Sequence, residues 1–134
     1  MKPMALSFMK TMSATVLALC CGCATVHVAT DFGGVKVEDG LEPIETVEIT
    51  NTGWLLFTCI PIASGNIEKP NSVTTKFFSR TVTLDNNLRL LSGEMARVNA
   101  TKMANLTSRY TDENILFILL KRRAYHTSAV LLGE

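Results

Sequence analysis

Residues 84–98, LDNNLRLLSGEMARV, carry the clearest periodic pattern in the chain and decide its fold. Their apolar side chains are spaced four, three, four and three residues apart, which places them in one stripe of an amphipathic helix. The stripe consists of Leu84, Leu88, Leu91, Met95 and Val98. Thr83 or Asp85 can provide the oxygen that caps the first turn, and Asn99 suits a left-handed stop. A single apolar stripe needs one apolar surface to cover, and we expect a sheet to provide it.

The segments on both sides of this helix are rich in β-branched and apolar residues and predict strands. Turn signals at 51–53 and 111–114 should separate neighbouring strands. The run 115–120 is apolar on both faces, and we expect an interior strand there. An apolar loop is the alternative for 54–60. The expected strands cover residues 44–50, 54–60, 73–82, 101–110, 115–120 and 124–132.

This order of elements predicts the α+β class. We expect a single small domain with a mostly antiparallel or mixed β-sheet and one amphipathic helix packed on one face. The chain has 134 residues, of which 47% are hydrophobic, and a formal net charge of +1. The length suits one domain, and the apolar fraction is too high for a disordered chain. A charge near zero leaves no electrostatic footprint for nucleic acid, so we expect none as a partner.

The first thirty residues differ from the rest of the chain. Lys2 and Lys10 precede a stretch from Thr11 to Thr30 that contains no charged residue. A basic start, a short apolar centre and a break at small residues are the layout of a secretory signal peptide. The apolar centre is shorter than the roughly 20 residues that a permanent transmembrane helix needs.

The break itself, Gly22-Cys23-Ala24-Thr25, resembles the lipobox of bacterial lipoproteins, in which a small residue precedes a cysteine that receives a diacylglyceryl thioether. The resemblance implies lipidation of Cys23 and cleavage of the chain just before it. The match is partial, because Cys20 stands where the family usually has a leucine. Cys20 and Cys21 are the alternative sites of modification. The resemblance covers the first 25 residues and carries no information about the domain that follows.

These observations divide the chain into a lipoprotein signal peptide at 1–22, a tether at 23–42 and an α+β domain at 43–134. The resemblance implies a cell-envelope protein whose lipid holds it to a membrane. An alanine after the modified cysteine, at Ala24, favours the outer membrane on its periplasmic side. The expected partners are this membrane and other envelope proteins.

The sequence offers few groups for catalysis. His27 follows the predicted lipid anchor closely, and His126 lies in a predicted strand without a nucleophile motif. Two histidines without further ligands fall short of a zinc site. Cys59 lies in an apolar run, where we expect it to be buried and inert. Glu45 and Glu48 should point to opposite faces of a strand, at a solvated edge. We therefore predict no catalytic residue, no metal and no cofactor.

Two features are candidates for contact with a partner. One is the apolar run after Gly53, which is core if it is a strand and a binding patch if it is a loop. The other is the basic triplet after 115–120, which can meet anionic lipid headgroups or form a solvated strand end. The candidate patch consists of Trp54, Leu55, Phe57, Lys121, Arg122 and Arg123.

These features favour a membrane-anchored envelope lipoprotein with a non-enzymatic interaction or structural role. The alternative is a periplasmic module that binds a small ligand and is tethered to the membrane. Its pocket would lie between the helix 84–98 and the sheet.

Overall fold

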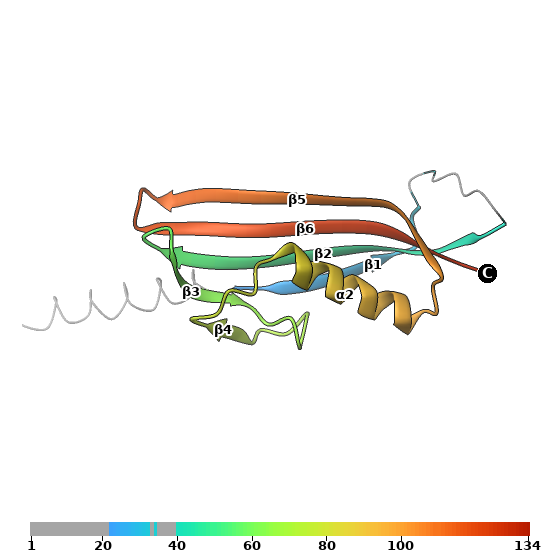
Figure 1. Ribbon diagram of the computed structural model, residues 1–134, viewed down its shortest axis with the longest axis horizontal. Coiled ribbons are helices and arrows are strands. Elements are labelled where there is room, and N and C mark those ends of the chain that lie inside the picture. The colour runs from blue at the N-terminus through green and yellow to red at the C-terminus, as the bar shows by residue number, and fades with distance from the viewer. Residues whose placement is uncertain (1–21, 33, 35–39) are drawn as a thin grey trace, which may run out of the picture.

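The computed structural model describes residues 22–32, 34 and 40–134. Within these residues, six strands form one antiparallel sheet, and a helix lies across it (Figure 1). This is the small domain with an antiparallel sheet and one helix that the sequence predicts, and it is consistent with the α+β class. The predicted signal peptide lies outside the described residues except for Gly22. In chain order the elements are β1 (Ala24–Ala29), β2 (Glu42–Leu56), β3 (Ile60–Gly65), β4 (Thr75–Phe77), α2 (Leu84–Arg97), β5 (Lys102–Leu116) and β6 (Leu120–Gly133).

Strand β2 organises the sheet, in the order β4-β3-β2-β6-β5. Along one edge β2 pairs with β6 over nearly its whole length. Along its other edge it pairs first with β3 and then with β1, so that Gly53 faces Ser64 and Asn51 faces Ala24. Strands β3 and β1 therefore lie end to end on one edge of β2.

The junction between β3 and β1 is tightly packed. A Cβ atom on Gly65 would lie 2.4 Å from the backbone nitrogen of Ala24 and 2.4 Å from the carbonyl carbon of Cys23, so only glycine fits there. The Thr52 amide donates to the Cys23 carbonyl oxygen at 2.8 Å. The predicted tether 23–42 is thus corrected in part, because residues 24–29 belong to the sheet.

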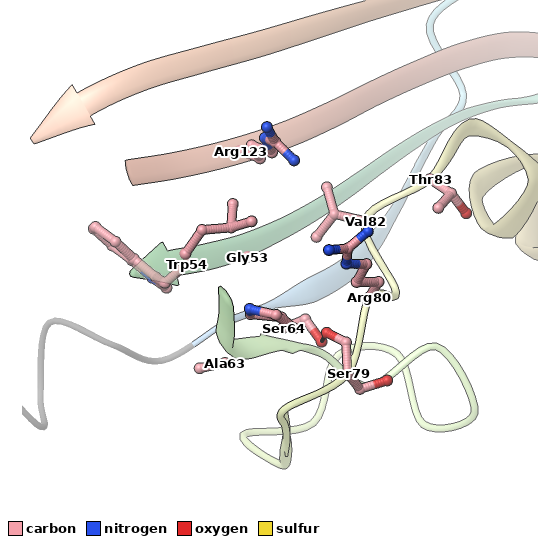
Figure 2. A pocket seen from close by; sticks show the side chains of 11 residues that line it. Gly53, Trp54, Ala63, Ser64, Ser79, Arg80, Val82, Thr83 and Arg123 are labelled. Atoms are coloured by element: carbon pink, nitrogen blue, oxygen red, sulfur yellow. Dashed lines mark hydrogen bonds between the residues drawn. The ribbon is translucent and has the colours of Figure 1, made fainter. Parts of the chain in front are cut away.

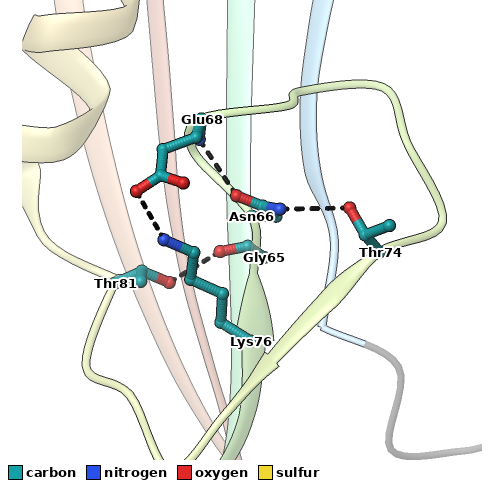
Figure 3. Close-up of polar contacts among 6 residues, drawn as sticks. All are labelled: Gly65, Asn66, Glu68, Thr74, Lys76 and Thr81. Carbon is teal, nitrogen blue, oxygen red and sulfur yellow. Dashed lines mark hydrogen bonds and ion pairs between the residues drawn. The ribbon is translucent and has the colours of Figure 1, made fainter.

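Polar contacts hold the segment that leaves β3 (Figure 3). The Thr81 hydroxyl donates to the Gly65 carbonyl oxygen at 2.8 Å. Lys76 Nζ donates to Glu68 Oε1 at 2.7 Å, and this contact lowers the pKa of the Glu68 carboxyl. These contacts keep the end of β3 in place against β1. The predicted strand 73–82 is shorter than expected, since only Thr75–Phe77 pairs with β3.

The helix covers one face of the sheet, as its apolar stripe predicts. Leu91 is fully buried against side chains of β1, β2 and β6, and other apolar residues of the helix pack around it. The Thr83 hydroxyl accepts a hydrogen bond from the Asn86 amide at 3.2 Å, which confirms the predicted cap. Asn99 has a φ of 54°, which confirms the left-handed stop.

Polar side chains also tie the helix to the sheet. The buried Asn87 amide donates to the Tyr125 carbonyl oxygen and to the Thr127 hydroxyl, each at 3.1 Å. Asn51, buried on β2, donates to the Thr81 carbonyl oxygen at 2.6 Å. A buried amide needs such partners, and here they fix where the helix begins relative to β2 and β6.

Glu45 differs from its predicted place at a solvated edge. It is only 7% exposed, because Arg97 Nη2 at the end of the helix donates to it at 2.6 Å. Arg97 also donates to Glu94 at 2.6 Å, and these two hydrogen bonds raise the pKa of the guanidinium. Glu48 lies exposed on the other face, so the prediction that the two glutamates point in opposite directions is confirmed.

Two predicted turns are wrong. Residues 51–53 lie inside β2, where Gly53 is needed because a Cβ atom would lie 2.6 Å from the Val82 side chain. Residues 111–114 lie inside β5, where Asp112 and Glu113 face Arg123 and Arg122 of β6. At both places the residues that resemble turn signals serve contacts with segments distant in the sequence.

We expect Gly65→Ala to lower the free energy of unfolding by about 1–3 kcal/mol, because the new methyl group must push β1 away from β3. Gly93→Ala is the matched control. Nothing lies within 4 Å of a Cβ atom there, so the helix should gain about 1 kcal/mol. Urea unfolding followed by circular dichroism measures both. Equal effects of the two substitutions would contradict the packing of the junction.

Candidate functional site

Two hairpin turns lie at the same end of the sheet (Figure 1). Both expose large apolar side chains. The β2–β3 turn contains Phe57 and the β5–β6 turn contains Phe117. The Phe57 amide donates to the Leu119 carbonyl oxygen at 3.1 Å, which joins the two turns. Phe57 is 50% exposed and Phe117 is 82% exposed. We call this end the apolar tip, and it consists of Phe57, Ile60, Ile115, Leu116, Phe117, Ile118 and Leu119.

The apolar tip corrects the prediction of an interior strand at 115–120. The run is apolar on both faces, but neither face is covered, since every side chain from Ile115 to Leu119 is at least 46% exposed. Soluble monomers rarely expose a contiguous patch of this kind, and such a patch usually marks contact with a protein or a membrane.

A charged belt lies directly behind the tip. Lys121 Nζ lies 2.9 Å from Asp112 Oδ2, and Arg123 Nε lies 3.7 Å from the same oxygen. Arg122 lies 3.8 Å from Glu113. The belt comprises these five side chains on β5 and β6. The predicted basic triplet is therefore ion-paired, with three cations against two anions.

The structure brings the two halves of the predicted patch together. On β2, Leu55 faces Lys121 and Trp54 faces Arg122. The three apolar members have different surroundings: Leu55 is buried, Trp54 is half-buried and Phe57 belongs to the tip. Ile60 and the run 115–119 lie outside the patch that the sequence predicts. For 115–119, the signal in the sequence is an apolar run without a polar face, which ends directly before a basic triplet.

Tyr110 and Tyr125 stand behind the belt on β5 and β6. Their rings lie 4.8 Å apart between centroids. The Tyr110 hydroxyl donates to Asp112 at 3.2 Å. Partial burial, with a smaller effect of the nearby Asp112 charge, raises the pKa of Tyr110. The Tyr110 hydroxyl thus holds the Asp112 carboxylate of the charged belt in place.

A cavity of about 190 Å³ opens beside the belt, between β2, β3 and the segment before the helix (Figure 2). Trp54, Arg80 and Arg123 are among its lining residues. The Trp54 and Arg123 side chains lie on opposite faces of the sheet, because Trp54 pairs with Arg122 and Arg123 pairs with Gly53. Arg80 donates to the Cys59 carbonyl oxygen at 3.1 Å. Two arginines, Arg80 and Arg123, thus line one cavity, which suits an anionic oxygen.

Cys23 is exposed at the start of β1. Its carbonyl oxygen bonds to Thr52, which precedes Phe57 by five residues on β2. At about 3.4 Å per residue, Cys23 stands about 17 Å behind the tip along the strand. The opposite end of the sheet carries the C-terminus (Figure 1).

The other candidate residues do not converge. His27 faces Glu48 across β1 and β2, while His126 Nδ1 and the Thr50 hydroxyl share a hydrogen bond of 3.0 Å. Cys59 lies exposed in the β2–β3 turn, so the prediction of a buried thiol is wrong. No group of three or more metal-ligating side chains gathers among residues 22–32, 34 and 40–134.

No helix in the described ranges is long and apolar enough to cross a membrane. No protein-family model, curated protein or solved structure matches the chain.

Because the tip is exposed, we expect Phe117→Asn to change the free energy of unfolding by no more than about 0.5 kcal/mol. Asparagine also tolerates the φ of 47° at this position. The control Leu91→Ala should lower the free energy of unfolding by about 2–5 kcal/mol, because Leu91 is fully buried. A large loss in both variants under urea would mean that the tip belongs to the core.

Proposed function

We propose that the protein is an envelope lipoprotein, held to a membrane by a lipid on Cys23, with a non-enzymatic interaction or structural role. Its α+β domain carries one apolar end. The observation that supports this proposal best is the position of Cys23, which is exposed next to the first strand and on the same half of β2 as the apolar tip. A lipid there would hold the tip toward the membrane.

The proposal implies a short and stiff attachment. Strand β1 begins at Ala24, one residue after Cys23. A thioether on the Cys23 sulfur would therefore join the acyl chains to the sheet without a flexible linker. The alanine at position 24 supports the outer membrane, on its periplasmic side, as the location. In this account the chain serves as a fixed contact surface at the membrane.

We expect Cys23→Ala to abolish incorporation of a labelled fatty acid into the protein. Cys59→Ala is the control, since Cys59 is also exposed but lies in a turn of the sheet. It should label like the wild type. Labelled cells and mass spectrometry of the purified chain provide the readout. Labelling that persists in Cys23→Ala and disappears in Cys20→Ala or Cys21→Ala would contradict the assignment to Cys23.

A second candidate function is the binding of a small anionic ligand beside the charged belt. The supporting observation is the pair of arginines, Arg80 and Arg123, that line one cavity. This cavity differs from the predicted pocket between helix and sheet, because that space is filled by Leu91 and its neighbours.

Trp54 is the only tryptophan of the chain and borders this cavity, so its fluorescence is the readout for binding. We expect titration with glycerol 3-phosphate to change the emission in a saturable way. Arg123→Gln should weaken binding by about tenfold or more, through loss of a charge-assisted hydrogen bond. Arg89→Gln is the control, since Arg89 lies on the helix outside this cavity. No saturation, or equal effects of the two variants, would contradict the candidate.

A further inference from the structure

We propose that the apolar tip inserts into the bilayer that carries the Cys23 lipid and thereby holds the sheet upright on the membrane. The inference deepens the proposed function, on which it rests for the identity of the membrane. The apolar tip would be a second attachment, beside the lipid on Cys23.

The turn residues are unsuited to a purely structural role. Phe57 and Phe117 adopt φ values of 49° and 47°, in the left-handed region that favours glycine and asparagine. Both side chains are exposed. Phenylalanine at these positions therefore neither favours the backbone conformation of the turn nor adds packing to the core. An apolar phase outside the protein would explain why phenylalanine occupies both positions, because that phase would bury both rings.

The order of residues behind the tip matches the layers of a bilayer surface. Apolar side chains occupy the turns, and the charged belt follows within a few residues on β5 and β6. Trp54 on β2 lies three residues behind Phe57, about 10 Å at the rise of an extended strand. Tryptophan prefers the boundary between hydrocarbon and headgroups. The tip would then reach about 5–10 Å into the membrane, as surface-bound segments do.

A further exposed aromatic residue lies at the same level on the other side of β3. Phe78 is 78% exposed and has a φ of 54°. Its amide donates to the Ile62 carbonyl oxygen at 3.2 Å. Because Leu55 pairs with Pro61, next to Ile62 in the chain, Phe78 lies near the level of Trp54. Trp54 and Phe78 thus provide aromatic contacts on two sides of the inserted end.

The charged belt sets the depth of insertion. Removing its five charged side chains from water costs more than their mutual attraction returns, so the belt would resist transfer into hydrocarbon. The belt also carries one cation in excess, which suits anionic headgroups. Cys23 stands about 17 Å behind the tip, where a glycerol thioether would lie among the headgroups when the tip is inserted. The two attachments can therefore be made at once, and each raises the effective concentration of the other.

The test places a tryptophan at each end of one hairpin. Phe117→Trp and Met103→Trp are made in a Trp54→Phe background, in the full chain purified from membranes and reconstituted into phosphatidylethanolamine–phosphatidylglycerol vesicles. Some vesicles contain lipids brominated on their acyl chains. We expect bromine to quench most of the emission of the Phe117→Trp variant and none of the emission of the Met103→Trp variant, because Met103 lies at the far end of β5.

A disrupting variant and a mass measurement separate this inference from the proposed function. Adding Ile118→Asp to the Phe117→Trp probe should abolish quenching while the lipid on Cys23 remains detectable by mass. An unquenched Phe117→Trp probe on a lipidated chain would overturn insertion and leave the proposed function standing. A quenched probe on a chain without lipid would support insertion and overturn the lipoprotein assignment. An unquenched tip that crosslinks to a second copy or to another protein would overturn the bilayer as the occupant.

Discussion

The structure depends on one shared edge of β2. Strands β3 and β1 occupy it in succession, and they can do so only because Gly65 leaves room for the backbone of Cys23 and Ala24. This arrangement fixes the backbone of Cys23 and Ala24 against the sheet. It also fixes the predicted lipid site, Cys23, against β2, the strand that leads to the apolar tip. The predicted lipid site and the apolar tip are therefore both held by the fifteen residues of β2.

Apolar residues serve two separate purposes in this small domain. One set is sequestered beneath the helix, where Leu91 meets the sheet and Asn87 fixes the register of the packing. The other set lies uncovered at the two turns and at the adjoining ends of β3 and β5. The charged belt separates them. In the proposed account, the first set maintains the fold and the second set is reserved for the lipid phase.

The helix is predictable from sequence because its signals are local. The stripe, the Thr83 cap and the Asn99 stop all lie within one short segment. The wrong predictions concern residues whose roles depend on distant partners. Gly53 resembles a turn signal but accommodates Val82, and Glu45 is buried by Arg97 from the far end of the helix. The run 115–120 is ambiguous because an interior strand and a membrane-inserted turn share the same apolar pattern. The candidate patch is predictable only in part, since pairing of β2 with β6 across the sheet has no signature in either segment alone.

Under the proposed function, two attachments, one covalent and one formed by the turns, hold a rigid sheet upright on a membrane. The orientation of the strands measures this directly. Polarised infrared spectroscopy of the lipidated wild-type protein on aligned bilayers reports the angle between the strand axes and the membrane normal. We expect strands close to the membrane normal. Strands that lie in the membrane plane, or that show no preferred direction, would contradict it.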